Sequence, residues 1–245
     1  LTFYTSQANV VHDALPVSET VFDNSPLNRD YEQGGPGLVW KVVKVSGISN
    51  RQGHTIRNEY GTNLNSDSVY LWICDEVNKI PKALSASKFY PAGRLLRNRI
   101  YDENAPNTTG NANWTEEFID KEGKVILKRT YDGTRRLSTY YVYDDLGLLR
   151  YVIPPFATIT TDGSNNAVLA AGDLANLCYI YRYDKRQRMV VKKLPGADSV
   201  LMVYDLRDRL AATQDGVQRA KSPKEWLFTK YDELNRPILT GTIQS

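Results

Sequence analysis

Short runs of strand-forming residues alternate with short polar turns through most of the chain. Residues 139–143 read TYYVY and residues 189–191 read MVV, and each run borders a turn segment that contains Asp. β-Branched and aromatic residues favour strands, whereas Asp, Asn and Gly favour tight turns. The pattern therefore predicts units of strand, tight turn and strand, each a β-hairpin whose turn fixes its register.

One turn segment recurs four times. Residues 143–149, 183–189, 204–210 and 231–237 read YDDLGLL, YDKRQRM, YDLRDRL and YDELNRP. The shared template is an aromatic residue, Asp, two variable residues, a turn-closing residue, usually a basic residue, and then an apolar residue. Such an internal repeat sets the architecture of the chain, because each copy is one supersecondary unit that stacks on its neighbours.

The aspartate and the closing residue of the template have a physical role. Asp at the first position of a type I turn accepts backbone N–H groups, and a residue that tolerates positive φ closes the turn. The closing position holds Gly147, Asp208 and Asn235, residue types that reach the left-handed region readily. Gln187 departs from this pattern, so we expect its turn to be more strained or of another type. We expect the four repeat tyrosines to be at least partly buried.

Weaker copies of the template precede the first clear repeat. Residues 118–125 keep the Asp, the Gly and the basic residue, whereas residues 89–96 have a shortened turn with Pro in place of Asp. The positions that we assign to the repeat, with a structural role, are Asp120, Gly123, Tyr143, Asp144, Gly147, Tyr183, Asp184, Arg188, Tyr204, Asp205, Arg209, Tyr231, Asp232 and Arg236.

An insertion separates the first two clear repeats. It runs from Pro154 to about Leu177, and its residues 170–177 are the best short helix in the sequence, with Asp173 as the expected N-cap. Residues 104–113 form a second irregular segment, which we expect to be a flexible loop. We interpret its two Asn-x-Thr sequons as chance matches.

The N-terminal part carries strand and turn signals without a clean repeat. Residues 22–29 resemble a degenerate copy with a longer turn, residues 38–45 are expected to form a strand, and residues 53–61 resemble a second hairpin arm. We therefore predict an N-terminal β segment (1–88) and a hairpin-repeat region (89–245) in one continuous sheet. The expected fold is all-β: an open, curved antiparallel sheet of successive hairpins with at most one short helix. Its unpaired edges favour self-association.

Charge and composition exclude several classes of function. A net charge of +3 on 245 residues gives no reason to expect a nucleic-acid partner, and no apolar run is long enough to span a bilayer. With two histidines and two isolated cysteines, the sequence offers no zinc site, and we expect no cofactor. Cys74 and Cys178 are expected to be buried thiols, although a disulfide between them stays open.

The repeat acids and bases are expected to pair with each other. Arg188, Arg209 and Arg236 occupy equivalent positions and predict a ladder that is solvated or salt-bridged to the repeat aspartates. Asp144 and Asp145 are adjacent and would point to opposite faces of a strand, so they are poorly placed for catalysis by a carboxylate pair. We therefore expect no enzymatic activity.

Together these segments resemble the RHS/YD-repeat family, in the version common in Bacteroidetes. The resemblance rests on the four Tyr-Asp turns and on linking phrases such as residues 151–155 (YVIPP), 192–196 (KKLPG) and 226–232 (WLFTKYD). Phrases at residues 25–29 and 53–60 extend it to roughly residues 17–241. The Tyr-Gly-Ala-Arg and Asp-Pro elements of self-cleaving relatives do not occur in this sequence, so self-cleavage is not carried over.

The resemblance implies a structural role. Members of the family wind their repeats into a hollow β-shell around a C-terminal cargo, often a polymorphic toxin, and are secreted or on the cell surface. It implies that the partners of this chain are the rest of its own full-length protein and that cargo. The alternative is a cell-surface module that binds carbohydrate through exposed Tyr and Trp rings. Aromatic residues in strands more often pack across strands than bind sugars.

Overall fold

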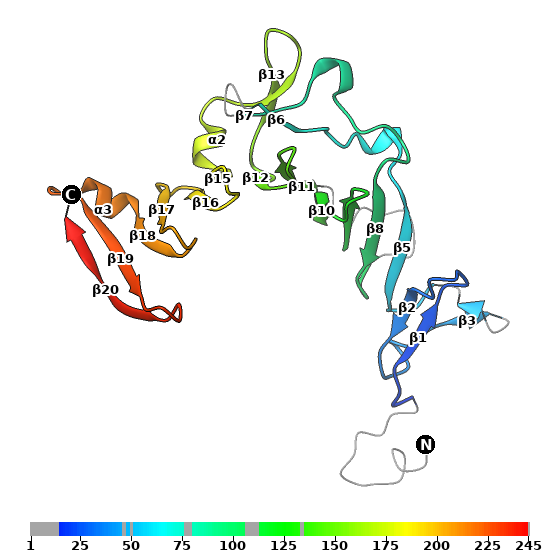
Figure 1. Cartoon of the computed structure of the whole chain (residues 1–245). Helices are drawn as coiled ribbons and strands as arrows, with labels where there is room; N and C mark the ends of the chain where they lie inside the picture. Colours follow the sequence, from blue (N-terminus) through cyan, green and yellow to red (C-terminus); the bar gives the residue numbers. More distant parts are fainter. Residues whose placement is uncertain are drawn as a thin grey trace. The chain divides into compact units, whose positions relative to one another are not determined.

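The computed structural model describes residues 15–45, 48–49, 51–75, 80–105, 113–132 and 135–244 (Figure 1). Its strands are β1 (Glu19–Phe22), β2 (Asp30–Gly34), β3 (Lys44–Val45), β4 (Ile48–Ser49), β5 (Ile56–Thr62), β6 (Ile73–Asp75), β7 (Ile80–Lys82), β8 (Leu96–Tyr101), β9 (Trp114–Ile119), β10 (Val125–Asp132), β11 (Arg135–Tyr143), β12 (Leu149–Ile153), β13 (Ile159–Thr161), β14 (Ala167–Leu169), β15 (Tyr179–Tyr183), β16 (Met189–Lys193), β17 (Val200–Tyr204), β18 (Leu210–Gln214), β19 (Glu225–Tyr231) and β20 (Pro237–Gln244). Its α-helices are α2 (Asp173–Asn176) and α3 (Gly216–Ala220), and two short 3-10 helices are η1 (Asn65–Asp67) and η2 (Ser85–Ser87).

Fourteen of these strands form one open antiparallel sheet. Their order is β1-β2-β5-β8-β9-β10-β11-β12-β15-β16-β17-β18-β19-β20, so neighbouring strands are mostly consecutive in sequence. The remaining strands form the two-stranded sheets β3–β4, β6–β7 and β13–β14. The predicted all-β fold of successive hairpins is therefore confirmed.

The expectation of at most one short helix is wrong, because α3 is a second one. Asp215 caps it, accepting a hydrogen bond from the backbone N–H of Gln218, while the Gln218 side chain accepts one from the Asp215 backbone N–H. This is a capping box, and its Asp-x-x-Gln motif can be recognised in the sequence. The start of α3 could therefore have been predicted from the sequence.

The chain divides into two compact units, each made of two sequence segments. Unit 1 contains Leu1–Val69 and Tyr90–Ser138, and unit 2 contains Tyr70–Phe89 and Thr139–Ser245. The domains expected at residues 1–88 and 89–245 remain a prediction.

In unit 1 one face of the sheet is buried. Along β9 the side chains of Trp114, Glu116 and Phe118 are buried and alternate with half-buried neighbours, as a half-covered strand requires. The Arg129 guanidinium of β10 donates to the Asp67 carbonyl at 2.6 Å, so the segment around Asp67 lies against this face. Leu127, fully buried, completes this part of the core.

The strand expected at residues 38–45 is wrong, because the chain turns back at this point. Residues 38–40 form a turn, and only β3 is extended in this range. The Gly35 N–H donates to the Trp40 carbonyl at 2.9 Å. A Cβ on Gly34 would lie 2.8 Å from the Val42 nitrogen, so glycine is what allows the returning chain to pass this close.

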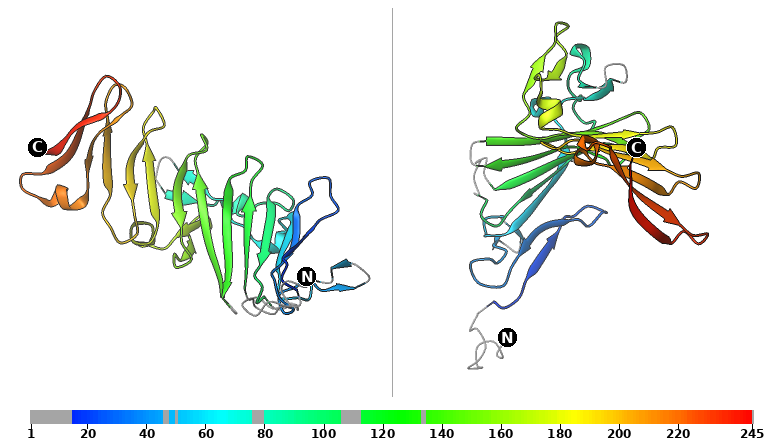
Figure 2. Two further views of the ribbon diagram at one scale, coloured as in Figure 1. Left: turned by 90° about the horizontal axis from the view of Figure 1, so that it is seen from below. Right: turned by 90° about the vertical axis from the view of Figure 1, so that its left-hand side faces the viewer.

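Unit 2 contains the hairpins β15–β16, β17–β18 and β19–β20 and, from Thr139 on, the hairpin β11–β12, and their strands lie side by side in Figure 2. Its core includes Tyr140, Tyr151 and Ile153 from the sheet, with Trp72 packed edge-on against Tyr140 at a ring-centroid distance of 6.1 Å. Neither cysteine forms a disulfide. Cys178 is buried, as expected, and burial raises its pKa to about 11, whereas Cys74 is only half-buried.

The predicted insertion holds the β13–β14 hairpin and α2. The helix lies within the predicted range, but its N-cap is Gly172, at φ 87°, and Asp173 is the first helical residue. The Asp173 carboxylate instead accepts the Thr158 N–H at 2.7 Å. Of the two sequon asparagines, Asn107 lies outside the described residues, and Asn113 has a positive φ of 61°.

Candidate functional site: the junctions between hairpins

One turn geometry recurs at six aspartates. In each turn the Asp carboxylate accepts the N–H groups two and four residues later, and the residue three later has a φ between 60° and 81°. The aspartates are Asp120, Asp144, Asp162, Asp184, Asp205 and Asp232. This is a type I turn followed by a left-handed residue, and in five of the six hairpins the adjoining strands carry the register shift that such a turn produces, whereas β13–β14 pairs without one. The predicted role of the repeat Asp is confirmed.

The turn closed by Gln187 is of the same type as the others. Gln187 has φ 62° and donates to the Asp184 carbonyl at 3.0 Å, as Asp208 does to Asp205. Of the two expectations for this turn, another turn type is wrong, and greater strain is what the left-handed Gln187 backbone implies. Glutamine carries the steric cost of a left-handed backbone that Gly147, at φ 76°, avoids.

Replacing Gln187 with glycine is expected to raise the free energy of unfolding by about 0.5–1 kcal/mol, because the relief of left-handed strain exceeds the entropy that glycine loses. Replacing it with valine is expected to lower that free energy by about 1–2 kcal/mol. Urea unfolding of both variants measures the difference. Equal stabilities would contradict the left-handed assignment.

The sixth aspartate turn, at Asp162, belongs to the inserted β13–β14 hairpin and was not predicted. Its closing residue is Asn165, at φ 60°, and the Asn166 side chain donates to both carboxylate oxygens. Residues 161–166 read TDGSNN, which contains the Asp and the closing Asn of the template. Because Thr161 stands at the tyrosine position, the segment does not match the full template. The turn is thus separable from the tyrosine of the repeat.

The repeat tyrosines join each hairpin to the preceding one. Tyr183 donates its hydroxyl to the Leu149 carbonyl at 3.0 Å. Tyr204 donates to Met189 at 2.8 Å, and Tyr231 donates to Leu210 at 3.0 Å. In every case the acceptor is the residue that pairs with the preceding repeat tyrosine. These tyrosines and Tyr143 are half-buried, as predicted.

The repeat arginines act across the same junctions. Arg188 donates to its own turn carboxylate, Asp184, at 2.7 Å, and to Asp208 of the next turn at 2.6 Å, and its guanidinium lies 4.8 Å from the Tyr204 ring centroid. Arg209 repeats the arrangement. It binds Asp205 at 2.7 Å, the Asp232 carbonyl at 3.0 Å and the Asn235 side chain at 3.1 Å, and it lies over the Tyr231 ring. The geometry is a salt-bridged ladder.

Unit 1 contains the same junction in a segment where sequence analysis found only a degenerate repeat. Arg29 binds the Asp23 carboxylate at 2.8 Å and lies 4.2 Å from the Tyr60 ring centroid. Tyr60 donates its hydroxyl to the Asp30 carbonyl at 3.1 Å, and Asp30 is the residue that pairs with Phe22. Phe22, Asp23 and Arg29 therefore correspond to the repeat Tyr, Asp and Arg.

Hydrogen bonds lower the pKa of five turn carboxylates. The Arg188 side chain lowers the pKa of Asp184, and the backbone N–H groups of Arg209 and Arg236 lower those of Asp205 and Asp232. Serine and asparagine side chains lower the pKa of Asp23 and Asp162 to about 2. A general acid needs a raised pKa, so these carboxylates are suited to accepting hydrogen bonds.

Acid should therefore weaken the fold over a defined range. Each of these groups has a folded pKa below its unfolded value near 3.8, so its contribution is complete above about pH 4 and disappears as the pH falls toward about 2. The free energy of unfolding, measured in urea from pH 5 to pH 2, is expected to fall over that range. Asp162→Asn removes one of these carboxylates, so the free energy of unfolding of this variant should depend less steeply on pH. An unchanged pH dependence would contradict the lowered pKa of Asp162.

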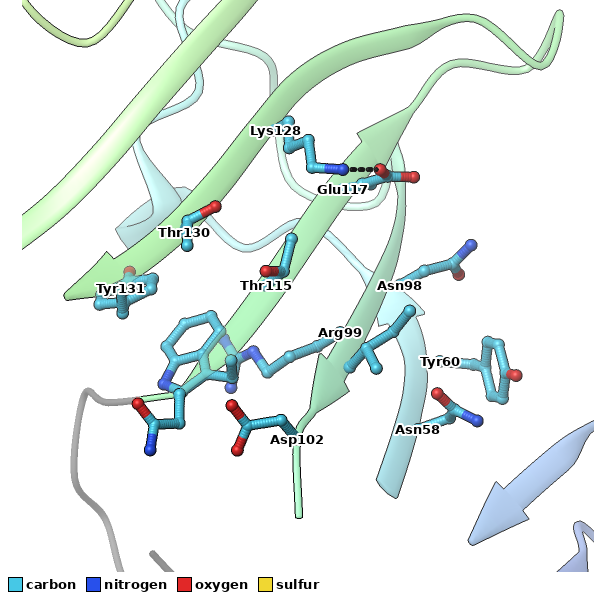
Figure 3. Close-up of a pocket in the computed structure, with 13 residues that line it drawn as sticks. Asn58, Tyr60, Asn98, Arg99, Asp102, Thr115, Glu117, Lys128, Thr130 and Tyr131 are labelled. Carbon is cyan, nitrogen blue, oxygen red and sulfur yellow. Dashed lines mark hydrogen bonds and ion pairs between the residues drawn. The ribbon is translucent and has the colours of Figure 1, made fainter. Parts of the chain in front are cut away.

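A hollow lined mostly by polar side chains, the polar hollow, lies on the open face of unit 1 and has a volume of about 620 Å³ (Figure 3). Its residues align across four strands in register, with Tyr60 opposite Asn98, Asn98 opposite Glu117, and Glu117 opposite Lys128. Lys128 donates to Glu117 at 3.0 Å. The lining contains no histidine, cysteine or serine.

The aromatic rings at one end of this hollow are already covered. Trp114 is 6% exposed, Tyr131 stacks on it at a ring-centroid distance of 3.8 Å, and the Arg99 guanidinium lies 3.9 Å from its centroid. A sugar platform needs a ring face open to solvent. The Trp114 ring lacks one.

Among the residues that the structure describes, no group of three or more His, Cys, Asp or Glu side chains is arranged to hold a metal ion. None of the helices in the described ranges is long and apolar enough to cross a membrane.

The recurring turns and junctions define an all-β protein built from repeated hairpins. A family model described as a domain of unknown function (DUF6443) matches residues 1–55. Among solved structures, the crystal structure of TcdB2-TccC3-TEV is similar, with a TM-score of 0.41 and 14% sequence identity over 93% of this chain. The match covers 10% of that chain, so this chain spans a small part of its length. A search of curated proteins gave no match.

Proposed function

We propose that the chain is a non-enzymatic wall segment of a secreted or cell-surface RHS/YD-repeat protein, and that the complete protein encloses a C-terminal cargo. The observation that supports this most is the use of the repeat side chains. The Tyr, Asp and Arg side chains of each repeat form hydrogen bonds within the turn and with the adjacent hairpin. They therefore serve to hold successive hairpins together in the sheet. The shell, the toxin cargo and the secreted or cell-surface location are proposed from the sequence resemblance to the RHS/YD-repeat family.

A carbohydrate-binding module is the weaker candidate. It requires open aromatic faces, and the repeat tyrosines are half-buried, with the hydroxyls of Tyr183, Tyr204 and Tyr231 bonded to backbone carbonyls. The polar hollow in unit 1 offers amides and hydroxyls, but its tryptophan is covered. A role as a wall segment explains the contacts of more of the repeat side chains than carbohydrate binding does.

The test uses the intact gene product and limited proteolysis. If the repeats wall in a cargo, the segment that follows them is expected to resist protease in the native protein and to become sensitive after denaturation. A following segment that is digested at once from the folded protein, or no such segment in the gene, would overturn the proposal. Fractionation of cells that produce the protein tests the proposed location.

A further inference from the structure

A pocket of about 360 Å³ lies in unit 1, apart from the repeat junctions. Strands β2 and β5 and the turn at residues 35–40 supply most of its lining, which includes Trp40 and His54. Its volume is at the lower end of the range for small-molecule sites, about 300–1,000 Å³. Apart from His54 and the Glu103 carboxylate, the described lining residues are uncharged, which favours a neutral ligand.

Trp40 is an exposed aromatic residue that the backbone holds in place. Its N–H donates to the Gly37 carbonyl at 3.2 Å, and its carbonyl accepts the Gly35 N–H at 2.9 Å. Its ring meets the His54 ring edge-to-face at a centroid distance of 5.5 Å, a contact that covers at most one face of the indole. Trp40 is 40% exposed, whereas Trp114 is 6% exposed, so Trp40 leaves ring surface open at the pocket.

His54 presents a hydrogen-bond acceptor beside this ring. Its Nδ1 lies 3.0 Å from the Glu103 carbonyl oxygen. Because a carbonyl oxygen accepts, Nδ1 carries the proton, and Nε2 of the neutral ring keeps a lone pair. A Cβ on Gly53 would lie 2.5 Å from the Lys41 carbonyl oxygen, so glycine lets this segment approach the turn that carries Trp40. His54 is exposed, so a ligand in the pocket can reach it.

The lining also carries other groups that form hydrogen bonds. Gln33 has an amide, Ser18 a hydroxyl and Glu103 a carboxylate. A pyranose ring has an apolar face of C–H groups and a rim of hydroxyls, and each hydroxyl both donates and accepts. An open indole beside mixed donors and acceptors therefore matches both parts of a sugar ring.

We propose that this pocket, the Trp40 pocket, binds a neutral saccharide. One sugar ring stacks on the Trp40 indole, and its hydroxyls donate to His54 Nε2 and form hydrogen bonds with Gln33. The size of the pocket fits a mono- or disaccharide at the end of a glycan. This site differs from a carbohydrate-binding module built on the repeat tyrosines, three of which donate to backbone carbonyls. It is therefore compatible with the role as a wall segment and does not rest on that role.

The test is a titration of the whole chain with neutral disaccharides. The probes are maltose, cellobiose, lactose and N,N′-diacetylchitobiose, and binding of each sugar is measured by saturation-transfer NMR. At least one is expected to bind saturably, with a dissociation constant in the millimolar range that one stacked ring and a few hydrogen bonds provide.

Three variants test the two contacts. Trp40→Ala should weaken the affinity about tenfold, whereas Trp40→Tyr keeps an aromatic face and should weaken it less than about threefold. His54→Asn keeps a donor for the Glu103 carbonyl and removes the Nε2 acceptor. It should therefore weaken binding about fivefold, as the loss of one hydrogen bond predicts.

Val39→Ala is the matched control. Val39 precedes Trp40 in the same turn, is 61% exposed and is not among the residues that line the pocket. The variant should leave the affinity unchanged, and urea unfolding verifies that each variant keeps its fold. No saturable binding of any probe, equal affinity of Trp40→Ala and the unmodified chain, or an equal loss in Val39→Ala would overturn the proposal. Binding of a proline-rich peptide at Trp40 without binding of any disaccharide would also overturn it and assign the pocket to a polypeptide.

Discussion

Replacing Glu116 with glutamine is expected to lower the free energy of unfolding by about 3–5 kcal/mol, because it removes the anion from a buried charge cluster. The Glu116 side chain is 1% exposed, accepts from Arg99 at 2.9 Å and lies 3.5 Å from the guanidinium of Arg129. Arg129, with its side chain 2% exposed, would keep its charge and lose its counter-ion. Glutamine has nearly the same shape, so the loss reports charge rather than packing.

Glu117 provides the matched control. It is the next residue on β9 and faces the open side of the sheet, where it pairs with Lys128, and both side chains are more than a third exposed. Glu117→Gln is expected to change the free energy of unfolding by less than about 1 kcal/mol. Urea unfolding of the two variants measures the contrast. Similar losses would mean that the Glu116 cluster is solvated and carries little of the stability.

The repeat turns could be predicted from sequence because their determinants are local. The Asp carboxylate accepts hydrogen bonds from the backbone N–H groups two and four residues later, and the closing residue needs a positive φ. A window of seven residues therefore contains every determinant of the turn. Even Gln187, the exception by residue type, takes the same turn, because the four hydrogen bonds of this window that do not involve Gln187 form as they do at Asp205 and Asp232. The agreement of these hydrogen bonds outweighs the unfavourable left-handed backbone of one glutamine.

The junctions could be predicted only in part, because their partners are distant in sequence. The ladder of Arg188, Arg209 and Arg236 follows from their equivalent positions, but nothing local shows that Arg188 reaches Asp208 or that Tyr204 reaches Met189. The Arg29–Tyr60 junction escaped for a second reason. Its turn is longer, and its tyrosine belongs to a strand with no Asp after it.

Where the template lacks its aspartate, the structure supplies the missing acceptor from elsewhere. Residues 89–96 have Pro91 at the Asp position, and the left-handed residue is Gly93, at φ 75°. The side-chain oxygen of Asn63 accepts the N–H groups of Arg94 and Leu95 at 2.9 and 2.8 Å. No sequence window could have revealed this substitution, because Asn63 lies about thirty residues earlier.

Asn63→Ala is accordingly expected to lower the free energy of unfolding by about 3–5 kcal/mol. The Asn63 side chain is 1% exposed and also donates to the carbonyls of Tyr90 and Pro91, at 3.3 and 2.9 Å. Alanine would leave two N–H groups and two carbonyls without this partner, and each buried group left unsatisfied costs about 1–3 kcal/mol. Water that enters the space recovers part of the cost, which keeps the expected loss below the sum.

Asn65→Ala is the control for this loss. Asn65 is exposed, and its side chain accepts one N–H, that of Ala92, at 3.2 Å. Its replacement should cost less than about 1 kcal/mol. Asn63→Asp keeps the acceptor and removes the two donors, so its stability should fall between those of Asn63→Ala and the unmodified chain. If Asn63→Asp were as unstable as Asn63→Ala, the acceptor role of Asn63 in the turn would be wrong, and its donors alone would hold the two segments together.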